Sequence, residues 1–223
     1  MTVYYNNLTY LLDQRNISVS QFENIILIPK VRIVEPTPNE LIKIADYFEI
    51  SIDQLLKEQL RDLNKILSAD IQFLILDVDG TMTDGGMYFT ENGDMMKKYN
   101  TKDGMAIKGL TKAGFHVGII SHSHQSKMVE NRANMLGIQN VYVGAESKLV
   151  ILDQWLLDLK LTRKQVAFIG DDINDLEIMK SVGISACPHD AVDSVRAISD
   201  IVLVNNGGQT CVREFIDKYL NTK

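Results

Sequence analysis

The chain has 223 residues, 45% of them apolar, which is enough for a buried core in one large domain or in a medium domain with a small one attached. Its formal net charge of −6 disfavours nucleic acid as the main partner, because a phosphate backbone attracts basic surfaces. Two cysteines offer no disulfide framework, and no apolar run reaches the roughly 20 residues that span a bilayer, so we expect a soluble cytoplasmic protein with no membrane partner.

Residues 1–66 are predicted to form a small all-helical domain. Capping residues precede three of its short amphipathic helices: Ser18 or Ser20 the second, Thr37-Pro38-Asn39-Glu40 the third and Ser51-Ile52-Asp53-Gln54 the fourth, which is expected to run to Leu63. Pro29 limits the second helix. We expect the domain boundary within residues 61–70.

Strand and helix signals alternate from Ile71 onward, which predicts a Rossmann-like α/β domain with a parallel sheet over residues 71–223. The expected strands are Phe73–Asp77, His116–Ile120, Asn140–Val143, Val166–Ile169, Gly183–Ala186 and Ile201–Val204. The expected helices are Asp103–Ala113, Gln125–Leu136, Glu146–Leu159, Ile173–Lys180, Ala191–Ile198 and Gln209–Leu220. Asn92-Gly93, between Met87–Thr90 and Met95–Tyr99, is typical of a β-hairpin, and this hairpin is the only flap that we expect.

Two pairs of acidic residues stand where apolar strands are expected to end. Asp77 and Asp79 follow one strand, and Asp171 and Asp175 follow another. The carboxyl ends of parallel strands form the ligand-binding edge of such a sheet, and acids gathered there repel one another unless a cation lies between them. Since Mg²⁺ prefers oxygen ligands, the two pairs together predict a magnesium site. Either pair alone is also compatible with an acidic turn or a helix cap.

Four segments are similar to the four motifs of the haloacid dehalogenase superfamily: Asp77-Val78-Asp79-Gly80-Thr81, Ser121 after Gly118-Ile119-Ile120, Lys148, and Gly170-Asp171-Asp172-Ile173-Asn174-Asp175. Within it, Asp77–Asp84 with Gly85, Lys97–Gly104, and Gly207-Gly208 with Val212-Arg213-Glu214 resemble the capless 3-deoxy-D-manno-octulosonate 8-phosphate phosphatases. The resemblance implies a capless Mg²⁺-dependent phosphatase for a phosphorylated sugar acid of lipopolysaccharide biosynthesis. It also implies a homotetramer built partly through the hairpins.

The resemblance further implies a role for each matching residue. Asp77 is expected to be the nucleophile that forms an aspartyl-phosphate, and Asp79 the general acid and base. The Mg²⁺ ligands are expected to be Asp77, the backbone carbonyl of Val78 (in preference to the side chain of Asp79) and Asp171, with Asp175 supporting them. The residues expected to bind phosphate or substrate are Ser121, Lys148, Gly80, Asn174, Lys98, Lys102 and Arg213.

The segment Ser121-His122-Ser123-His124-Gln125 departs from the family, whose members commonly continue from the hydroxyl residue with Gly-Arg. Ser123 is therefore an alternative to Ser121. We interpret His122 and His124 as surface or substrate-rim residues, because Mg²⁺ prefers oxygen ligands. The departure leaves the sugar open, and an N-acylneuraminate 9-phosphate phosphatase, or another sugar phosphatase, is the alternative.

The N-terminal residues resemble a truncated helix-turn-helix domain of the Cro/C1 type, in the segments Asn7–Ser18, Ser20-Gln21 and Pro36–Leu56. Where that family has a turn and a recognition helix, this chain has only Ile28–Glu35. Residues 1–60 also contain five Lys and Arg against eight Asp and Glu, which repels DNA. A packing or oligomerisation module is the preferred interpretation, and a DNA-binding regulator with a ligand-sensing phosphatase-like domain is the alternative.

Overall fold

The computed structural model describes residues 2–57, 60–91, 95–122 and 127–220. The chain divides into two compact units, Met1–Ser68 and Ala69–Lys223. Among the described residues, no helix is long and apolar enough to cross a membrane.

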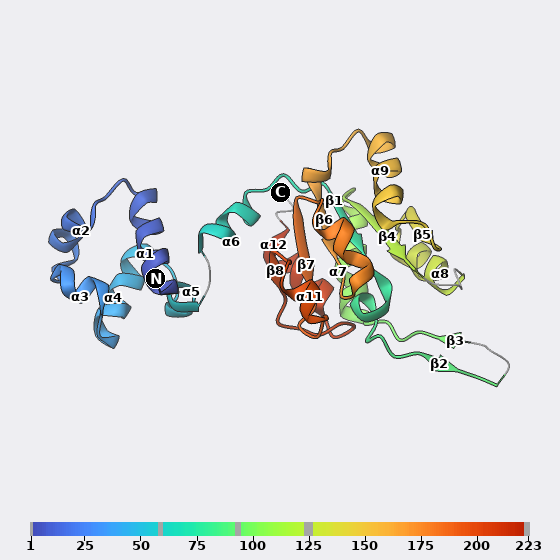
Figure 1. Ribbon diagram of the computed structural model, residues 1–223, viewed down its shortest axis with the longest axis horizontal. Helices are drawn as coiled ribbons and strands as arrows, with labels where there is room; N and C mark the ends of the chain where they lie inside the picture. Colours follow the sequence, from blue (N-terminus) through green and yellow to red (C-terminus); the bar gives the residue numbers. More distant parts are fainter. Residues whose placement is uncertain (1, 58–59, 92–94, 123–126, 221–223) are drawn as a thin grey trace. The chain divides into compact units, whose positions relative to one another are not determined.

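The first unit is all-helical, with α1 Val3–Gln14, α2 Val19–Ile26, α3 Lys30–Val34, α4 Pro38–Phe48, α5 Ile52–Lys57 and α6 Leu60–Leu67 (Figure 1). Ser18 caps α2 in a capping box with Gln21, and Thr37 pairs with Glu40 in the same way at α4. Large side chains such as Leu8, Phe22, Ile33, Ile44 and Leu55 are fully buried in its core. The helix expected from Ser51 to Leu63 corresponds to α5 and α6; residues 58–59 between them lie outside the described residues.

The second unit is built on a six-stranded sheet of β1 Phe73–Leu76, β4 His116–Ser121, β5 Asn140–Val143, β6 Val166–Ile169, β7 Ile184–Cys187 and β8 Ile201–Val202. The strand order is β5-β4-β1-β6-β7-β8, and every pair is parallel. This is the doubly wound order, in which the chain reverses its direction of travel between β1 and β6. The predicted α/β fold is confirmed.

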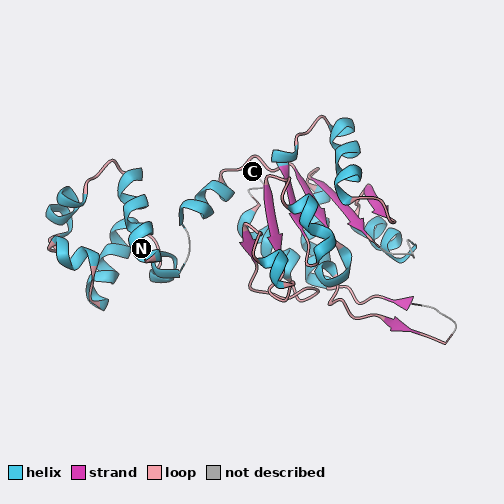
Figure 2. Ribbon diagram, viewed as in Figure 1, coloured by secondary structure: helices cyan, strands magenta, loops and turns pink. Residues whose placement is uncertain are grey.

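Helices cover both faces of the sheet (Figures 1 and 2). They are α7 Thr101–Lys112, α8 Lys127–Leu136, α9 Lys148–Leu159, α10 Leu176–Met179, α11 Asp193–Arg196 and α12 Cys211–Tyr219. Side chains of α9, α10 and α11 pack with β1, β6 and β7 in one buried cluster, whereas α7 contacts α8 and α12. The core therefore lies on both sides of β1, whose four residues are completely buried.

Polar side chains shorten three of the expected elements. The strand expected to end at Val204 ends at Val202, because the Val204 N–H donates to the carboxylate of Glu214 instead of to a strand. The helix expected from Ile173 begins as a tight turn, Ile173–Asp175, where the side chains of Asp172 and Asp175 accept from backbone N–H groups. Ser147 caps α9, which starts at Lys148 rather than Glu146.

The expected hairpin consists of β2 Tyr88–Phe89 and β3 Met95–Met96, which pair antiparallel and project from the domain (Figure 1). Met87, Tyr88, Phe89 and Met96 are all more than half exposed. The Asn92-Gly93 turn predicted between the strands lies outside the described residues. The flap thus presents large apolar side chains to its surroundings.

Candidate active site

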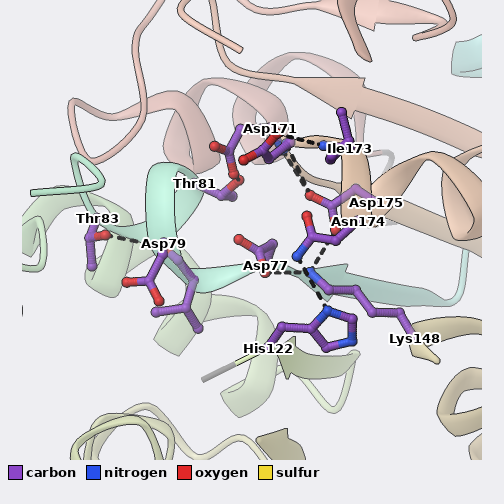
Figure 3. Close-up of polar contacts among 12 residues, drawn as sticks. Asp77, Asp79, Thr81, Thr83, His122, Lys148, Asp171, Ile173, Asn174 and Asp175 are labelled. Carbon is purple, nitrogen blue, oxygen red and sulfur yellow. Dashed lines mark hydrogen bonds and ion pairs between the residues drawn. The ribbon is translucent and has the colours of Figure 1, made fainter. Parts of the chain in front are cut away.

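The reversal point of the sheet brings the two acidic segments together. Leu76 of β1 is in register with Ile169 of β6, and the Asp77 N–H donates to the Ile169 carbonyl over 2.9 Å. The chain then leaves both strands at the same edge. As a result, one carboxylate oxygen each from Asp77, Asp171 and Asp175 lie within 4.8 Å of one another (Figure 3).

Lys148 places a buried ammonium group among these acids. It is the first residue of α9, and its Nζ lies 2.5 Å from Oδ1 of Asp77 and 2.6 Å from Oδ1 of Asp175. Its side chain is 1% exposed. One ammonium group therefore contacts two of the three carboxylates, and the site carries excess negative charge when all are ionised.

Burial and the neighbouring charges shift the pKa values of Asp77, Asp171 and Lys148. Burial raises the pKa of Asp77 to about 7; Lys148 opposes this shift and Asp175 adds to it. Burial, followed by Asp77 and Asp175, raises the pKa of Asp171 to about 8. For Lys148 burial acts to lower the pKa, but the two carboxylates outweigh it and the pKa is raised. Each acid in the group thus favours a positive neighbour.

The turn after β1 fits closely around Asp171. Gly80 has φ +88°, and a Cβ atom there would meet Oδ2 of Asp171 at 2.0 Å, so only glycine allows this approach. The Thr81 hydroxyl also donates to Asp171 over 3.3 Å. An all-oxygen donor set with surplus negative charge is what a hard divalent cation requires, so the residues fit Mg²⁺.

Asp175 has a different position from the other two acids. It is completely buried; its Oδ1 accepts from Lys148, and its Oδ2 accepts from the backbone N–H of Asp171 and that of Asp172 at 3.0 and 3.4 Å. Both oxygens thus already hold the loop and the lysine. This arrangement suits a residue that does not bind the cation directly but holds the neighbouring ligand Asp171 in position.

The Val78 carbonyl, which the sequence suggested as a metal ligand, is hydrogen-bonded within the turn that follows β1. This carbonyl accepts from the backbone N–H of Thr83 over 3.0 Å and from its hydroxyl over 3.2 Å (Figure 3). A carbonyl oxygen has two lone pairs, and both are used inside the turn. Among the residues that the structure describes, Asp77, Asp171 and Asp175 form a group of carboxylates that could hold a cation.

Lys97 is a site residue whose place the sequence did not reveal. Its side chain is 1% exposed and forms an ion pair with the carboxylate of Asp79, which is 34% exposed. The next residue, Lys98, is exposed and pairs with Asp84 over 2.6 Å. Neighbouring side chains in an extended segment point to opposite sides, so one of these two lysines is expected to point inward. The sequence alone does not indicate which one.

The structure places the remaining expected residues as follows. Ser121 is the buried last residue of β4, the neighbour of β1. Asn174 is exposed in the turn before Asp175, and Lys102 is exposed in the first turn of α7. The guanidinium group of Arg213 pairs with Asp217 over 2.5 Å on α12. Ser123, the alternative to Ser121, and His124, interpreted as a surface or substrate-rim residue, lie outside the described residues.

A C-terminal loop holds the turn after β1 in place. The Gly208 N–H donates to the Thr81 carbonyl over 3.0 Å, and the thiol of Cys211 donates to the same oxygen over 3.3 Å. A Cβ atom on Gly207 would meet the Gly80 carbonyl oxygen at 1.8 Å. Residues that are far apart in sequence therefore shape the loop that follows Asp77.

Comparison with known proteins gives consistent matches for this unit. A family model described as haloacid dehalogenase-like hydrolase matches residues 144–216. The 3-deoxy-D-manno-octulosonate 8-phosphate phosphatase of Yersinia pestis is 39% identical over 153 residues, which are 69% of this chain and 81% of that protein. The phosphatase of the same name from Escherichia coli K12 is 36% identical over 151 residues, 68% of this chain and 80% of the relative.

Solved structures agree with these matches. The crystal structure of the Yersinia pestis phosphatase superposes with a TM-score of 0.67 at 37% identity, covering 71% of this chain and 84% of the other. The phosphatase of Moraxella catarrhalis, solved in complex with magnesium ion, phosphate ion and a KDO molecule, gives a TM-score of 0.65 at 30% identity, with 70% and 88% covered.

Proposed function

Because the chain belongs to the haloacid dehalogenase-like hydrolases, in the family of the 3-deoxy-D-manno-octulosonate 8-phosphate phosphatases, we propose that it hydrolyses that sugar acid phosphate or a close relative in the presence of Mg²⁺. One structural observation carries the proposal: the carboxylates of Asp77, Asp171 and Asp175 meet around Lys148 at the reversal point of the sheet.

Asp77 is assigned as the nucleophile. Its carboxylate attacks phosphorus, an aspartyl-phosphate forms, and the bond from phosphorus to the sugar oxygen breaks with its electron pair on that oxygen. Asp77 and Asp171 would hold Mg²⁺, with Asp175 behind them, and the bound cation offsets the repulsion between a carboxylate and a phosphate dianion. Lys148 neutralises further negative charge beside Asp77.

Asp79 is assigned as the general acid and base, and Lys97 as the residue that holds it. Asp79 gives a proton to the departing sugar oxygen and then takes one from the water that attacks the phosphorus. The bond from phosphorus to Asp77 breaks in this second step, which releases orthophosphate and restores the carboxylate. In Figure 3 the carboxylate of Asp79 points away from the group of Asp77, Asp171 and Asp175, and it pairs with the ammonium group of Lys97.

We assign four groups to binding the phosphoryl oxygens of the substrate: the Lys148 ammonium group, the Ser121 hydroxyl, the Asn174 amide and the Gly80 N–H. All four belong to segments at the same edge of the sheet. For the carboxylate of a sugar acid, Lys98, Lys102 and Arg213 are the cationic candidates. Lys102 has the strongest case, because Lys98 already pairs with Asp84 and Arg213 with Asp217.

The hairpin supports a homo-oligomer, and we assign the homotetramer as its form. Exposed Met87, Tyr88, Phe89 and Met96 make an apolar surface that a copy of the chain would cover. We place the enzyme in the cytoplasm, where its two free cysteines stay reduced.

The first unit is assigned as a packing or interaction module of the helix-turn-helix type that has lost DNA readout. α3 is five residues long, which is too short for a full recognition helix, and two of its exposed residues, Val31 and Val34, are apolar. A gel-shift experiment on genomic fragments tests the alternative, a DNA-binding regulator, which would produce a sequence-specific shift.

The function is tested by measuring orthophosphate release from a panel of sugar phosphates, with Mg²⁺ and with EDTA. We expect Mg²⁺-dependent turnover, with the largest kcat/KM for 3-deoxy-D-manno-octulosonate 8-phosphate. A larger value for N-acylneuraminate 9-phosphate would keep the chemistry and change the sugar. No Mg²⁺-dependent release from any of these compounds, or from an aryl phosphate, would refute the function.

A further inference from the structure

His122 contacts two of the segments that are assigned to phosphate binding. It directly follows Ser121 at the end of β4. Its Nε2 lies 2.9 Å from the carbonyl oxygen of Glu146, two residues before Lys148. Its Nδ1 lies 3.4 Å from the side-chain nitrogen of Asn174, the residue before Asp175 (Figure 3). The ring thus bridges the segments on both sides of the ion pair between Lys148 and Asp175.

One tautomer of the ring satisfies both contacts as hydrogen bonds. A carbonyl oxygen only accepts, so the Nε2 of His122 must carry a proton and donate it to Glu146. The amide nitrogen of Asn174 only donates, so Nδ1 must carry a lone pair and accept from it. The neutral tautomer with its proton on Nε2 satisfies both contacts, and neither the other tautomer nor the imidazolium does.

The contact with His122 restricts the amide of Asn174. An exposed asparagine side chain ordinarily rotates among several orientations. With one of its N–H groups donated to His122, the second N–H of Asn174 and its oxygen have defined directions. In Figure 3 this amide lies between the ring of His122 and the carboxylates of Asp77 and Asp175.

From this geometry we propose that His122 is a positioning residue for the phosphoryl group. As the Nε2–H tautomer it holds the Asn174 amide ready to donate to a phosphoryl oxygen, and it fastens the turn that leads to Lys148. The inference rests on the proposed function, because Asn174 is assigned there as a phosphate ligand. It also explains why this chain has His122 after Ser121, where related phosphatases commonly have glycine after the hydroxyl residue.

The tautomer is tested directly by long-range ¹H–¹⁵N spectra of the full chain near pH 8, where an unperturbed imidazole is neutral. The chain has four histidines, and the H122N variant identifies the signals of His122 by their loss. We expect the pattern of the Nε2–H tautomer. The pattern of the Nδ1–H tautomer, or fast exchange between the two, would overturn the inference.

The effect on phosphate binding is tested by calorimetric titration of orthophosphate in the presence of Mg²⁺. We expect H122A to weaken binding about three- to tenfold, the range for loss of one ordinary hydrogen bond. H122N should bind within about twofold of the wild type, because the Asn oxygen can replace Nδ1 as the acceptor for Asn174. If His122 acts through Asn174, adding H122A to N174A should change binding no further.

His116 provides the matched control, since it is an exposed histidine at the opposite end of β4, and H116A should leave orthophosphate affinity unchanged. The inference would be overturned if H122A weakened binding equally with and without Asn174, or if H122N failed to restore binding. It would also be overturned if the wild type bound no orthophosphate. Failure of the proposed function is distinguishable, because it is absence of Mg²⁺-dependent hydrolysis by the wild type, whatever the tautomer and binding data show.

Discussion

The buried ammonium group of Lys148 lies 2.5 Å from the carboxylate of Asp77, although the two residues are 71 positions apart in the chain. The same group bonds Asp175, so one lysine joins the acids that follow two different strands. This contact both stabilises the folded site and restrains the assigned nucleophile. A substitution of Lys148 should therefore change both stability and activity.

Replacing Lys148 with Met should lower both stability and turnover. The substitution keeps most of the volume but leaves buried carboxylates without their ammonium partner, a loss that costs about 3–5 kcal/mol in comparable buried pairs. Thermal denaturation in EDTA should show this, and millimolar Mg²⁺ should restore part of the stability. K112M, at an exposed lysine of α7, is the control; an equal loss in both variants would contradict the account.

Replacing Lys97 with Met should reduce kcat about tenfold and leave KM nearly unchanged. Lys97 restrains Asp79, which protonates the leaving oxygen, and a poor leaving group depends most on that proton. The loss should therefore be larger with a sugar phosphate than with p-nitrophenyl phosphate. K112M, at an exposed lysine of α7 that has no assigned role, is the control and should change kcat less than twofold. Equal losses of kcat with the two substrates would show that Lys97 does not support proton transfer by Asp79.

Stability in EDTA should fall as the pH rises from about 4 to about 8. The pKa of Asp77 is raised to about 7 and that of Asp171 to about 8, from an ordinary value of 3.8. An acid whose pKa is higher in the folded state stabilises the fold below the unfolded value, and this contribution is lost as the pH rises through the folded value.

Mg²⁺ should compensate for this loss. It should raise the melting temperature of the second unit by several degrees near pH 8 and much less near pH 5, where Asp77 and Asp171 keep their protons in the fold. Calorimetric scans at the two pH values measure the difference. An identical Mg²⁺ effect at both would show that the cation binds away from these acids.

Replacing Gly207 with Ala should impair activity, whereas the same change at Gly109 should not. The new Cβ at position 207 would meet the Gly80 carbonyl oxygen at 1.8 Å, so the turn that follows Asp77 has to move. At Gly109, inside α7, nothing lies within 4 Å of the new atom, and Ala should stabilise the helix by about 0.5–1 kcal/mol. Turnover and melting temperature of the two variants measure the contrast, and an active G207A enzyme would show that the loop does not support the site.

Much of the fold was predictable, because its signals are local. The apolar runs Phe73–Leu76 and Val166–Ile169 correspond to buried central strands, and the capping pair of Thr37 and Glu40 starts α4 as expected. Two acidic segments after two parallel strands were also enough to predict that the segments meet, since topology alone brings strand ends to one edge.

The details that escaped prediction depend on contacts between distant residues. Nothing local distinguishes Lys97 from Lys98, and only the packing of the hairpin base decides which one reaches Asp79. The two hydrogen bonds from Thr83 to the Val78 carbonyl likewise depend on the fold of the turn and have no signal in the sequence. The contact of Asp103 also joins distant residues, because its carboxylate accepts a hydrogen bond from the backbone N–H of Arg213, 110 positions away at the start of α12.

The central claim is that Asp77 accepts the phosphoryl group. It is tested most directly by acid-quenching the enzyme during turnover of a ³²P-labelled substrate and mapping the labelled peptide. We expect an acid-stable, alkali-labile label on the peptide that contains Asp77, and no label in D77N. An acid-stable label on a peptide that lacks Asp77, or wild-type turnover by D77N, would contradict it.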